Sequence, residues 1–151
     1  MSFTGARATT NGDVEYVASR LREADLREIQ AVTGETPLAA LSNGRENSQP
    51  CLTGIYRDEP ICIFGVIPAS DSQAIIWLLG TDRIEAARKP FLRLTREFIF
   101  EWSQQYSKLY NIVDSRNTTH IRCLEWAGCV FTGHRMIGSV PFINFEISKG
   151  N

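Results

Sequence analysis

Hydrophobic residues recur along the chain at two different spacings, which separates segments expected to be strands from segments expected to be helices. Apolar or alternating runs of strand length are found at residues 51–56, 60–67, 74–79, 109–113 and 142–147. The runs at 60–67 and 74–79 are almost wholly apolar, which is typical of central strands buried on both faces. The polar residues 57–59 join the first two runs and predict a hairpin.

The N-terminal residues predict a short strand followed by a helix. Residues 7–10 are expected to form an edge strand, with a turn at Asn11 and Gly12. Apolar side chains then recur at helical spacing. Asp13 is therefore expected to cap the first helix.

Two more helical segments are expected before the hairpin. Asp25 is expected to begin the first of them and Gly34 to end it, and its apolar stripe consists of Leu26, Ile29 and Val32. Thr36 provides a cap for a short helix over residues 38–42, because a proline follows it at the first helical position. A polar loop is expected at residues 43–50.

A long amphipathic helix is predicted over residues 89–106. Pro90 suits its first turn, because proline has the backbone angle of a helix and lacks an N–H that would go unbonded there. Its apolar positions follow helical spacing, namely Phe91, Leu94, Phe98 and Trp102. The residues before it, 82–90, are expected to form a charged loop.

Residues 109–131 predict a strand, a tight turn, a helix and a second strand. Asn117 or Thr118 can cap the helix, and Gly128 stands where a left-handed C-terminal residue is expected. A turn-rich connection is expected at residues 132–141, ahead of the last strand.

Composition indicates an ordinary globular protein. With 151 residues, of which 43% are hydrophobic and 22% charged, the chain is expected to form a single domain over residues 1–151. The net charge of −1 provides no general positive field, so neither nucleic acid nor membrane is expected as a partner. No apolar run approaches the roughly 20 residues that span a bilayer, and the N-terminus lacks a signal-peptide core. A soluble, intracellular protein is expected.

The four cysteines are expected to be free, mostly buried thiols, because none has Cys-x-x-Cys spacing. They are Cys51, Cys62, Cys123 and Cys129. A zinc site that used His120 or His134 would need a closed set of ligands, which the spacing does not provide. No metal is therefore expected.

The unit at residues 109–131 resembles the last strand–helix–strand block of the GNAT fold of N-acetyltransferases. Asn117 and Gly128 stand at the family's separation, and Cys129 replaces an aromatic residue. The sequence NTTHIRCLEWAGCVF at residues 117–131 is similar also to the internal virion protein A family of T7-like phages, and the similarity extends more loosely through residues 48–82. The resemblance implies an α+β, GNAT-like fold: a mixed, mostly antiparallel sheet with helices on both faces.

The resemblance also implies where coenzyme A would bind. Acetyl-CoA would lie between the strands at 74–79 and 109–113, with its pantetheine arm along the backbone of Leu78, Leu79, Gly80 and Thr81 and with Asn117 beside it. GNAT enzymes bind the pyrophosphate with a glycine-containing loop before a helix, because glycines let backbone amides approach the phosphates. Residues 82–90 contain no glycine. The side chains that would replace those amides are Arg83, Arg88 and Lys89, and a solvated basic loop is the alternative.

A second departure from the family concerns acid catalysis. Many GNAT enzymes carry a Tyr in the last helix that protonates the departing thiolate. Counting from Asn117, this position falls on Leu124, which cannot donate a proton. The candidates to replace it are His120, Cys123 and Tyr106, and the candidates for a general base are Glu59, Asp82 and Asp114. The sequence singles out none of them, so the catalytic residues stay unassigned.

These departures favour a phage protein that acts in virion assembly or structure. It would be located in the virion and the infected host cytoplasm, with other virion proteins as partners and no assigned cofactor. The alternative is an active acetyl-CoA-dependent N-acyltransferase. A third interpretation is a non-catalytic module that binds coenzyme A or a host peptide. A cleft filled by side chains such as Trp77, Phe91 or Trp126 would exclude the enzyme.

Overall fold

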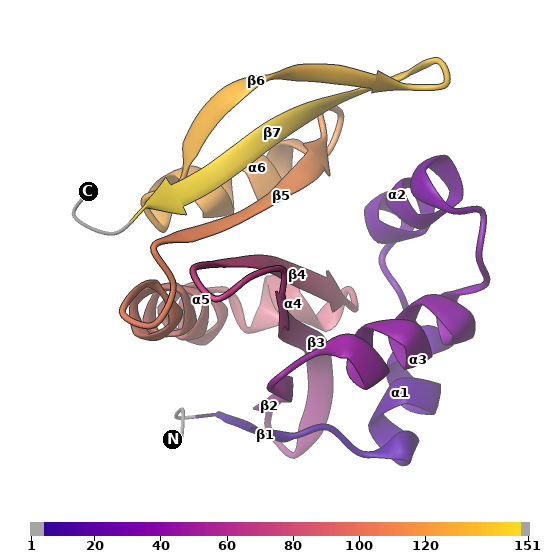
Figure 1. Ribbon diagram of the computed structural model, residues 1–151. Helices are drawn as coiled ribbons and strands as arrows, with labels where there is room; N and C mark the ends of the chain where they lie inside the picture. The colour runs from indigo at the N-terminus through magenta and orange to yellow at the C-terminus, as the bar shows by residue number, and fades with distance from the viewer. Residues whose placement is uncertain (1–4, 149–151) are drawn as a thin grey trace.

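A computed structural model describes residues 5–148 as a twisted sheet with helices packed on it (Figure 1). In chain order the elements are β1 (Ala6–Ala8), α1 (Asn11–Ala18), α2 (Glu23–Val32), α3 (Pro37–Asn47), β2 (Cys51–Tyr56), β3 (Glu59–Pro68), β4 (Gln73–Gly80), α4 (Arg83–Ala86), α5 (Arg88–Ser103), β5 (Lys108–Asp114), α6 (Thr118–Trp126), β6 (Val130–Ile137) and β7 (Val140–Ser148). The predicted α+β class is confirmed.

The seven strands lie in the order β1-β2-β3-β4-β5-β7-β6. All neighbours are antiparallel except β4 and β5, so the expected mixed, mostly antiparallel sheet is confirmed. β4 and β5 pair only where Gln73–Ile75 faces Lys108–Tyr110. Beyond this short pairing the two strands diverge (Figure 1).

Side chains of the central strands alternate between two hydrophobic clusters, one on each face of the sheet. Phe64 and Ile76 point to the larger cluster, which contains the buried residues of α5 and α6. Ile63 belongs to the other cluster, which is formed by α1, α2 and α3 and is joined there by Trp77. A strand with large apolar residues at both odd and even positions is therefore covered on both faces, as the continuous apolar runs predicted.

The β2–β3 hairpin and most helix ends follow the local signals. Arg57 and Asp58 both have positive φ, 51° and 65°, as a two-residue hairpin loop requires. The Thr36 side chain accepts a hydrogen bond from the Ala39 N–H and caps α3. Asn117, rather than Thr118, caps α6, and Gly128 has a φ of +96°.

Three predictions about the N-terminal helices were wrong. The cap of α1 is Thr10, and Asp13 is the third helical residue of a capping box, so Asn11 and Gly12 are helical rather than a turn. The stripe predicted for α2 is only partly buried, because Leu26 and Val32 are exposed. The capping box lies within residues 10–13 and is a local signal, whereas the exposure of Leu26 and Val32 depends on what packs against α2.

α3 continues past its predicted end and removes the loop expected at residues 43–50. A Cβ on Gly44 would lie 2.7 Å from Cζ2 of Trp77, so glycine at this position lets the helix pack directly on that ring. The helix stop predicted from Asn43 and Gly44 was therefore wrong, because packing decides the use of this glycine.

Two connections were also predicted wrongly. β6 extends through Ile137, so most of the turn-rich connection at 132–141 is strand, and only Gly138 and Ser139 form the turn. β6 pairs with β7, and the hydrogen bonds of this pairing keep residues 132–137 in a strand although glycine and polar residues there favour a turn. The charged segment 82–90 contains the short helix α4 instead of being a loop.

Candidate functional site

The site lies where β4 and β5 separate. Asn111 stands just beyond the last paired residues of β5, and its Nδ2 donates a hydrogen bond of 2.8 Å to the Ile76 carbonyl of β4. Its Oδ1 accepts from the Ile112 N–H at 2.7 Å. The Asn111 side chain thus bridges the two strands at the point where their backbone pairing ends.

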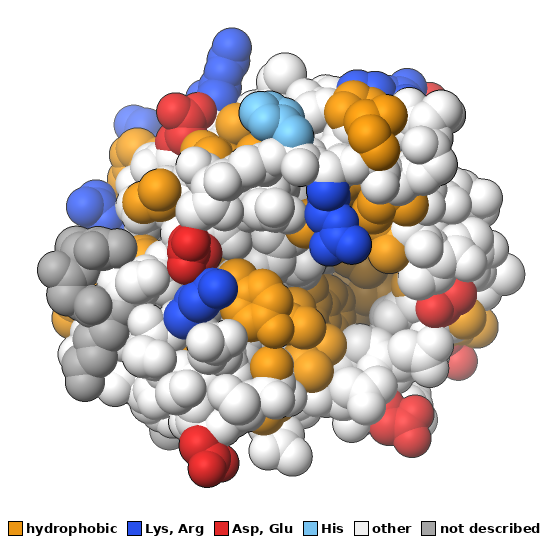
Figure 2. Space-filling model, turned by 45° about the horizontal axis from the view of Figure 1, so that its top comes forward, with side chains coloured by type: hydrophobic (Ala, Val, Ile, Leu, Met, Phe, Trp, Pro, Cys, Tyr) orange, Lys and Arg blue, Asp and Glu red, His pale blue; other side chains and the backbone are white. Residues whose placement is uncertain are grey.

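A cavity of about 310 Å³ occupies the gap beyond this bridge. One wall comes from α5 and α6 and another from α2, α3 and the residues between them. The remainder comes from β4 and β5, together with Phe64 of β3 and Phe142 and Phe145 of β7. Aromatic and aliphatic side chains make up most of the lining, including Phe64, Phe91, Phe98, Phe142, Phe145 and Trp77. Figure 2 shows a hollow on this face of the molecule with hydrophobic side chains along it. The volume lies at the low end of small-molecule sites, which span roughly 300–1,000 Å³.

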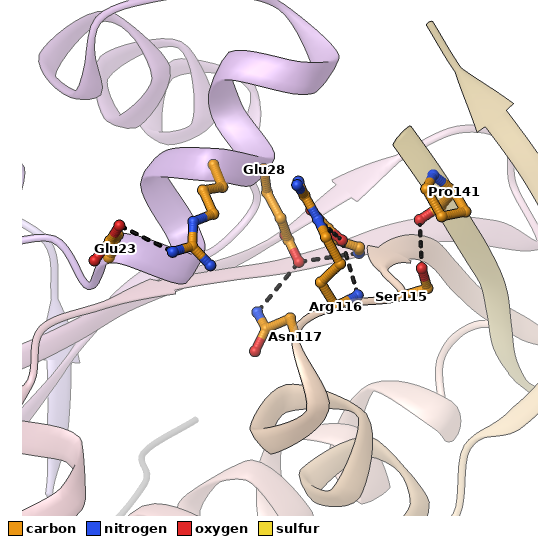
Figure 3. A network of polar contacts seen from close by, with 8 residues as sticks. Glu23, Glu28, Ser115, Arg116, Asn117 and Pro141 are labelled. Carbon is orange, nitrogen blue, oxygen red and sulfur yellow. Dashed lines mark hydrogen bonds and ion pairs between the residues drawn. The ribbon is translucent and has the colours of Figure 1, made fainter. Parts of the chain in front are cut away.

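Glu28 brings a carboxylate from α2 to the end of β5 (Figure 3). Its Oε1 accepts the Asp114 backbone N–H at 3.1 Å and the Asn117 Nδ2 at 3.2 Å. Oε2 has no hydrogen-bond partner among residues 5–148. Burial raises the pKa of Glu28 to about 7, with the neighbouring charge of Asp25 as a further cause.

The junction between β5 and α6 is itself fixed by polar contacts. The buried carboxylate of Asp114 accepts from Arg116, at 2.6 Å from Nη2 and 2.9 Å from the backbone N–H. The Arg116 guanidinium holds the pKa of Asp114 below its usual value. Ser115 donates from its hydroxyl to the Pro141 carbonyl at 2.8 Å. Glu28 therefore joins a rigid corner, not a free loop.

His120 lines the cavity from the first turn of α6. Its backbone N–H donates to Asn117 Oδ1 at 3.3 Å, whereas its Nδ1 is buried and has no hydrogen-bond partner among the described residues. Burial lowers the pKa of His120 to about 4, so the imidazole is neutral at physiological pH. His120 is thus a partly buried residue of the cavity lining.

The residues predicted for the pantetheine arm divide into two groups. Leu78 and Leu79 line the cavity. The Gly80 N–H instead donates to Asp25 Oδ2 at 2.8 Å, and the Gly80 carbonyl accepts from the Arg22 N–H at 2.9 Å. The Thr81 N–H donates to the Ile61 carbonyl at 2.9 Å. The backbone groups at the end of β4 are therefore already bonded within the chain.

The predicted phosphate ligands lie outside the cavity. Arg83 is half-exposed and forms an ion pair with Glu59 at 3.4 Å, while Arg88 and Lys89 are exposed in the first turn of α5. The Ala87 N–H, between α4 and α5, donates to the Arg83 and Ile84 carbonyls at 3.2 and 3.1 Å. A closed helical turn thus stands where the glycine loop of a coenzyme A enzyme would expose its amides.

Only some of the residues considered for catalysis lie at the cavity. Leu124, His120 and Cys123 line the cavity, whereas Tyr106 does not. Among the candidate bases, Glu59, Asp82 and Asp114 are absent from the described lining, and Asp114 is paired with Arg116. The predicted free cysteines are confirmed, with Cys62, Cys123 and Cys129 buried.

Glu28 is one of the cavity residues that sequence reasoning missed, as is Asn111. Glu28 follows Asp25 by three residues and directly precedes the buried Ile29, so two carboxylates lie near the inward side of one helix. This combination is the signal that would have found it, because acidic side chains are rarely placed next to a buried stripe without a partner.

Side chains do not fill the cleft. Trp77 and Phe91 line the cavity and leave its volume open. Trp126 lies outside it, with the Arg96 guanidinium 4.8 Å from its ring centroid. The condition that would have excluded an enzyme is therefore not met.

Comparison with solved structures identifies the architecture. The ribosomal-protein-alanine N-acetyltransferase from Brucella melitensis has a TM-score of 0.69 at 13% identity, with 95% of this chain and 98% of that chain covered. The fold is GNAT-like. A GNAT-family acetyltransferase from Bacillus anthracis has a TM-score of 0.69 at 12% identity, with 97% and 95% covered. The spermidine N-acetyltransferase from Vibrio cholerae, solved with CoA and spermine, has a TM-score of 0.65 at 18% identity, with 95% and 94% covered.

A family model matches residues 66–134 and is described as Bacteriophage T7, probable scaffold protein Gp13. The resemblance to a T7 phage family thus has support over a segment that runs from the end of β3 into β6. No curated protein matches the sequence. Among residues 5–148, no helix is long and apolar enough to cross a membrane, and no three acidic, His or Cys side chains gather closely enough to hold a metal ion.

Proposed function

We propose that this chain is a GNAT-like phage protein that acts in particle assembly or structure, in the manner of an internal virion protein. The observation that carries this proposal is the match of residues 66–134 to a phage scaffold family model. That segment includes β4, α5, β5 and α6, which contribute part of the cavity lining. Its partners would be other virion proteins, and its location the virion and the infected host cell.

The closed end of β4 supports a role without coenzyme A chemistry. Gly80 and Ala87 use their backbone groups within the chain, so few amides are left to bind a pyrophosphate. Leu124, at the position of the family's general acid, is a buried hydrocarbon. Since a fold does not determine a function, these losses are compatible with a scaffold that keeps only the architecture.

The test uses a phage that carries this gene. Particles should contain the chain at a fixed copy number by quantitative mass spectrometry. A deletion should reduce the yield of infectious particles and be restored by the wild-type gene supplied in trans. Absence of the chain from purified particles, together with a normal yield after deletion, would contradict the proposal.

The open cavity favours one second candidate, an acyl-CoA-dependent N-acyltransferase. Acetyl-CoA would enter between β4 and β5, with its arm along Leu78 and its phosphates on Arg83, Arg88 and Lys89. An amine would attack the thioester directly, so the protein would chiefly position the reactants.

Calorimetric titration with acetyl-CoA tests this second candidate. Micromolar binding that is lost when Arg83, Arg88 and Lys89 are all changed to Ala would support it. The matched control changes three other exposed arginines to Ala, namely Arg93, Arg122 and Arg135. No binding at millimolar acetyl-CoA, or equal loss in both triple variants, would reject a dedicated coenzyme site.

A further inference from the structure

The outer side of α5 and α6 exposes aromatic rings and arginines that do not line the cavity. Phe100 on α5 is 65% exposed, and Trp126 on α6 is 47% exposed. Arg93, Arg96 and Phe100 are spaced by three and four residues, so they lie in one row on the side of α5 that faces away from the core. Exposed rings that gather on neighbouring helices indicate an interaction surface, whereas a single exposed apolar residue does not.

Arg96 joins the two helices into one surface. Its guanidinium carbon lies 4.8 Å from the centroid of the Trp126 ring. Arg122 precedes Trp126 by one helical turn and is also exposed, so α6 presents an arginine and a ring in one row, as α5 does. The surface formed by Arg93, Arg96, Phe100, Arg122 and Trp126 is called the α5–α6 face below.

The three arginines of the α5–α6 face have no carboxylate partner among residues 5–148. Every ion pair in that part of the chain involves another cation. The acidic residues of the same two helices, Glu97, Glu101 and Glu125, form no ion pair there either. Three guanidinium groups are therefore available to an anion, although the chain as a whole has a net charge of −1.

This combination of side chains fits a protein partner better than a nucleic acid. Arginine and large aromatic residues are enriched at the centres of protein–protein interfaces, where lysine is depleted, and the α5–α6 face contains no lysine. Guanidinium groups bind carboxylates in bidentate geometry, and ring faces bury apolar side chains. A nucleic acid gains its affinity from many phosphate contacts along a basic track, and three arginines bordered by glutamates do not form such a track.

We propose that the α5–α6 face docks an acidic segment of another virion protein, in which carboxylates bind Arg93 and Arg122 and an apolar side chain packs on Phe100 and Trp126. This docking rests on the proposed role in particle assembly, of which it specifies the surface and the chemistry of the partner. Both helices lie wholly within residues 66–134, which match the phage scaffold family model. Because the face is separate from the cavity lining, docking is independent of any coenzyme.

Photocrosslinking in the particle identifies the partner. Phe100 is replaced by the photoreactive residue p-benzoylphenylalanine during infection, and mass spectrometry locates the cross-linked peptide. The peptide should come from one other virion protein and contain Asp or Glu beside an apolar residue. The matched control places the same photoreactive residue at Met136, which is 63% exposed on β6. Cross-links from position 100 to DNA or to a second copy of this chain would overturn the proposal. The same segment cross-linked from both positions, or no cross-link from position 100, would also overturn it.

A charge reversal tests the chemistry of the contact. Arg93→Glu combined with Phe100→Ser should lower the number of copies of the chain per particle about tenfold, because loss of an interface anchor weakens binding by at least this factor. The matched control combines Arg135→Glu with Met136→Ser, since both residues are exposed on β6, and should leave the copy number at the wild-type level. An unchanged copy number for the first variant, or an equal loss for both, would overturn the proposal.

Restoration of binding provides a second test that does not depend on the loss alone. An acidic residue of the cross-linked segment, changed to Arg, should restore the copy number of a chain that carries Arg93→Glu. Failure of every such reversal would overturn the assigned charge contact. Circular dichroism and thermal unfolding of the purified variants check folding, and the melting temperature should hardly change because the altered side chains are exposed.

The same particles separate failure of this docking from failure of the proposed function. If wild-type particles lack the chain, the role in assembly is wrong and the docking is wrong with it. If wild-type particles contain the chain and the variant with Arg93→Glu and Phe100→Ser enters them equally well, only the docking is wrong.

Discussion

The two ends of the gap between β4 and β5 are built differently. At the end of β4 the backbone of Gly80 is bonded to Asp25 and Arg22, and a closed helical turn follows. At the other end, where the backbone pairing of β4 and β5 stops, the Asn111 side chain bridges the strands, and an open cavity lies beyond it. The divergence of two strands and the exposure of phosphate-binding amides are therefore separate properties, and one can be kept without the other.

Loss of the Asp25 carboxylate is the change expected to affect the closed end most. Asp25 is fully buried and accepts from the Arg22 guanidinium and from the Gly80 N–H. Asp25→Ala leaves both donors unpaired in the interior, so the free energy of unfolding should fall by about 3–5 kcal/mol. Urea denaturation measures the loss. The exposed control Glu23→Ala should lower the free energy of unfolding by under about 1 kcal/mol. Equal losses for the two variants would disprove that Asp25 stabilises the end of β4.

Glu28, which lines the open cavity, should make the free energy of unfolding depend on pH. Its pKa is about 7 in the folded protein against an ordinary 4.5, so the folded state binds the proton more tightly. This contribution is complete below about pH 4.5 and is lost as the pH rises through about 7. Glu28→Gln keeps an acceptor for both N–H donors and removes the charge, so its stability relative to wild type should rise by roughly 2–4 kcal/mol from about pH 5 to about pH 8. A difference that does not vary with pH would contradict the burial of this carboxylate.

The Asn111 bridge should contribute less to the free energy of unfolding than Asp25 or Glu28. Asn111→Ala removes the hydrogen bond to the Ile76 carbonyl, and the free energy of unfolding should fall by about 1 kcal/mol. Amide hydrogen exchange of β4 and β5 should accelerate beyond their paired residues. Asn47→Ala is the control, because Asn47 is exposed and bonds only within α3. If Asn111→Ala and Asn47→Ala lower the free energy of unfolding by equally small amounts, the Asn111 hydrogen bond does not stabilise the spacing of the two strands.

The smallest effect is expected from the basic residues near α4. Arg83→Ala removes a half-exposed ion pair with Glu59, and solvent screens such a pair, so the change should stay below about 1 kcal/mol. Thermal unfolding in low and high salt measures it. A large loss that disappears in salt would show that the pair holds the closed end together.

Much of the fold could be predicted because its signals are local. The apolar runs of β3 and β4, the hairpin at Arg57 and Asp58, and the caps Thr36 and Asn117 each depend on residues a few positions apart. Two of the errors occurred where a distant partner decided the outcome. Gly44 stays helical because it faces Trp77, and β6 is long because β7 pairs with it.

The candidate site was less predictable for the same reason. The sequence pointed to the β4–β5 gap and to His120, and a cavity lined by His120 lies there. It offered no sign that Arg22 and Asp25 occupy the end of β4. Glu28 contacts Asp114 and Asn117, which follow it by 86 and 89 residues. No periodicity reports a contact across such a separation.

By itself, the sequence determined the alternation of strands and helices, the missing glycines of residues 82–90 and the hydrocarbon at Leu124. These properties belong to residue type and to short-range spacing. Only the tertiary structure decided that the end of β4 is closed, that a cavity persists beside it and that Glu28 enters this cavity. The pKa of a carboxyl group and the partners of a backbone amide depend on what surrounds them in space, and folding brings those neighbours from distant parts of the chain.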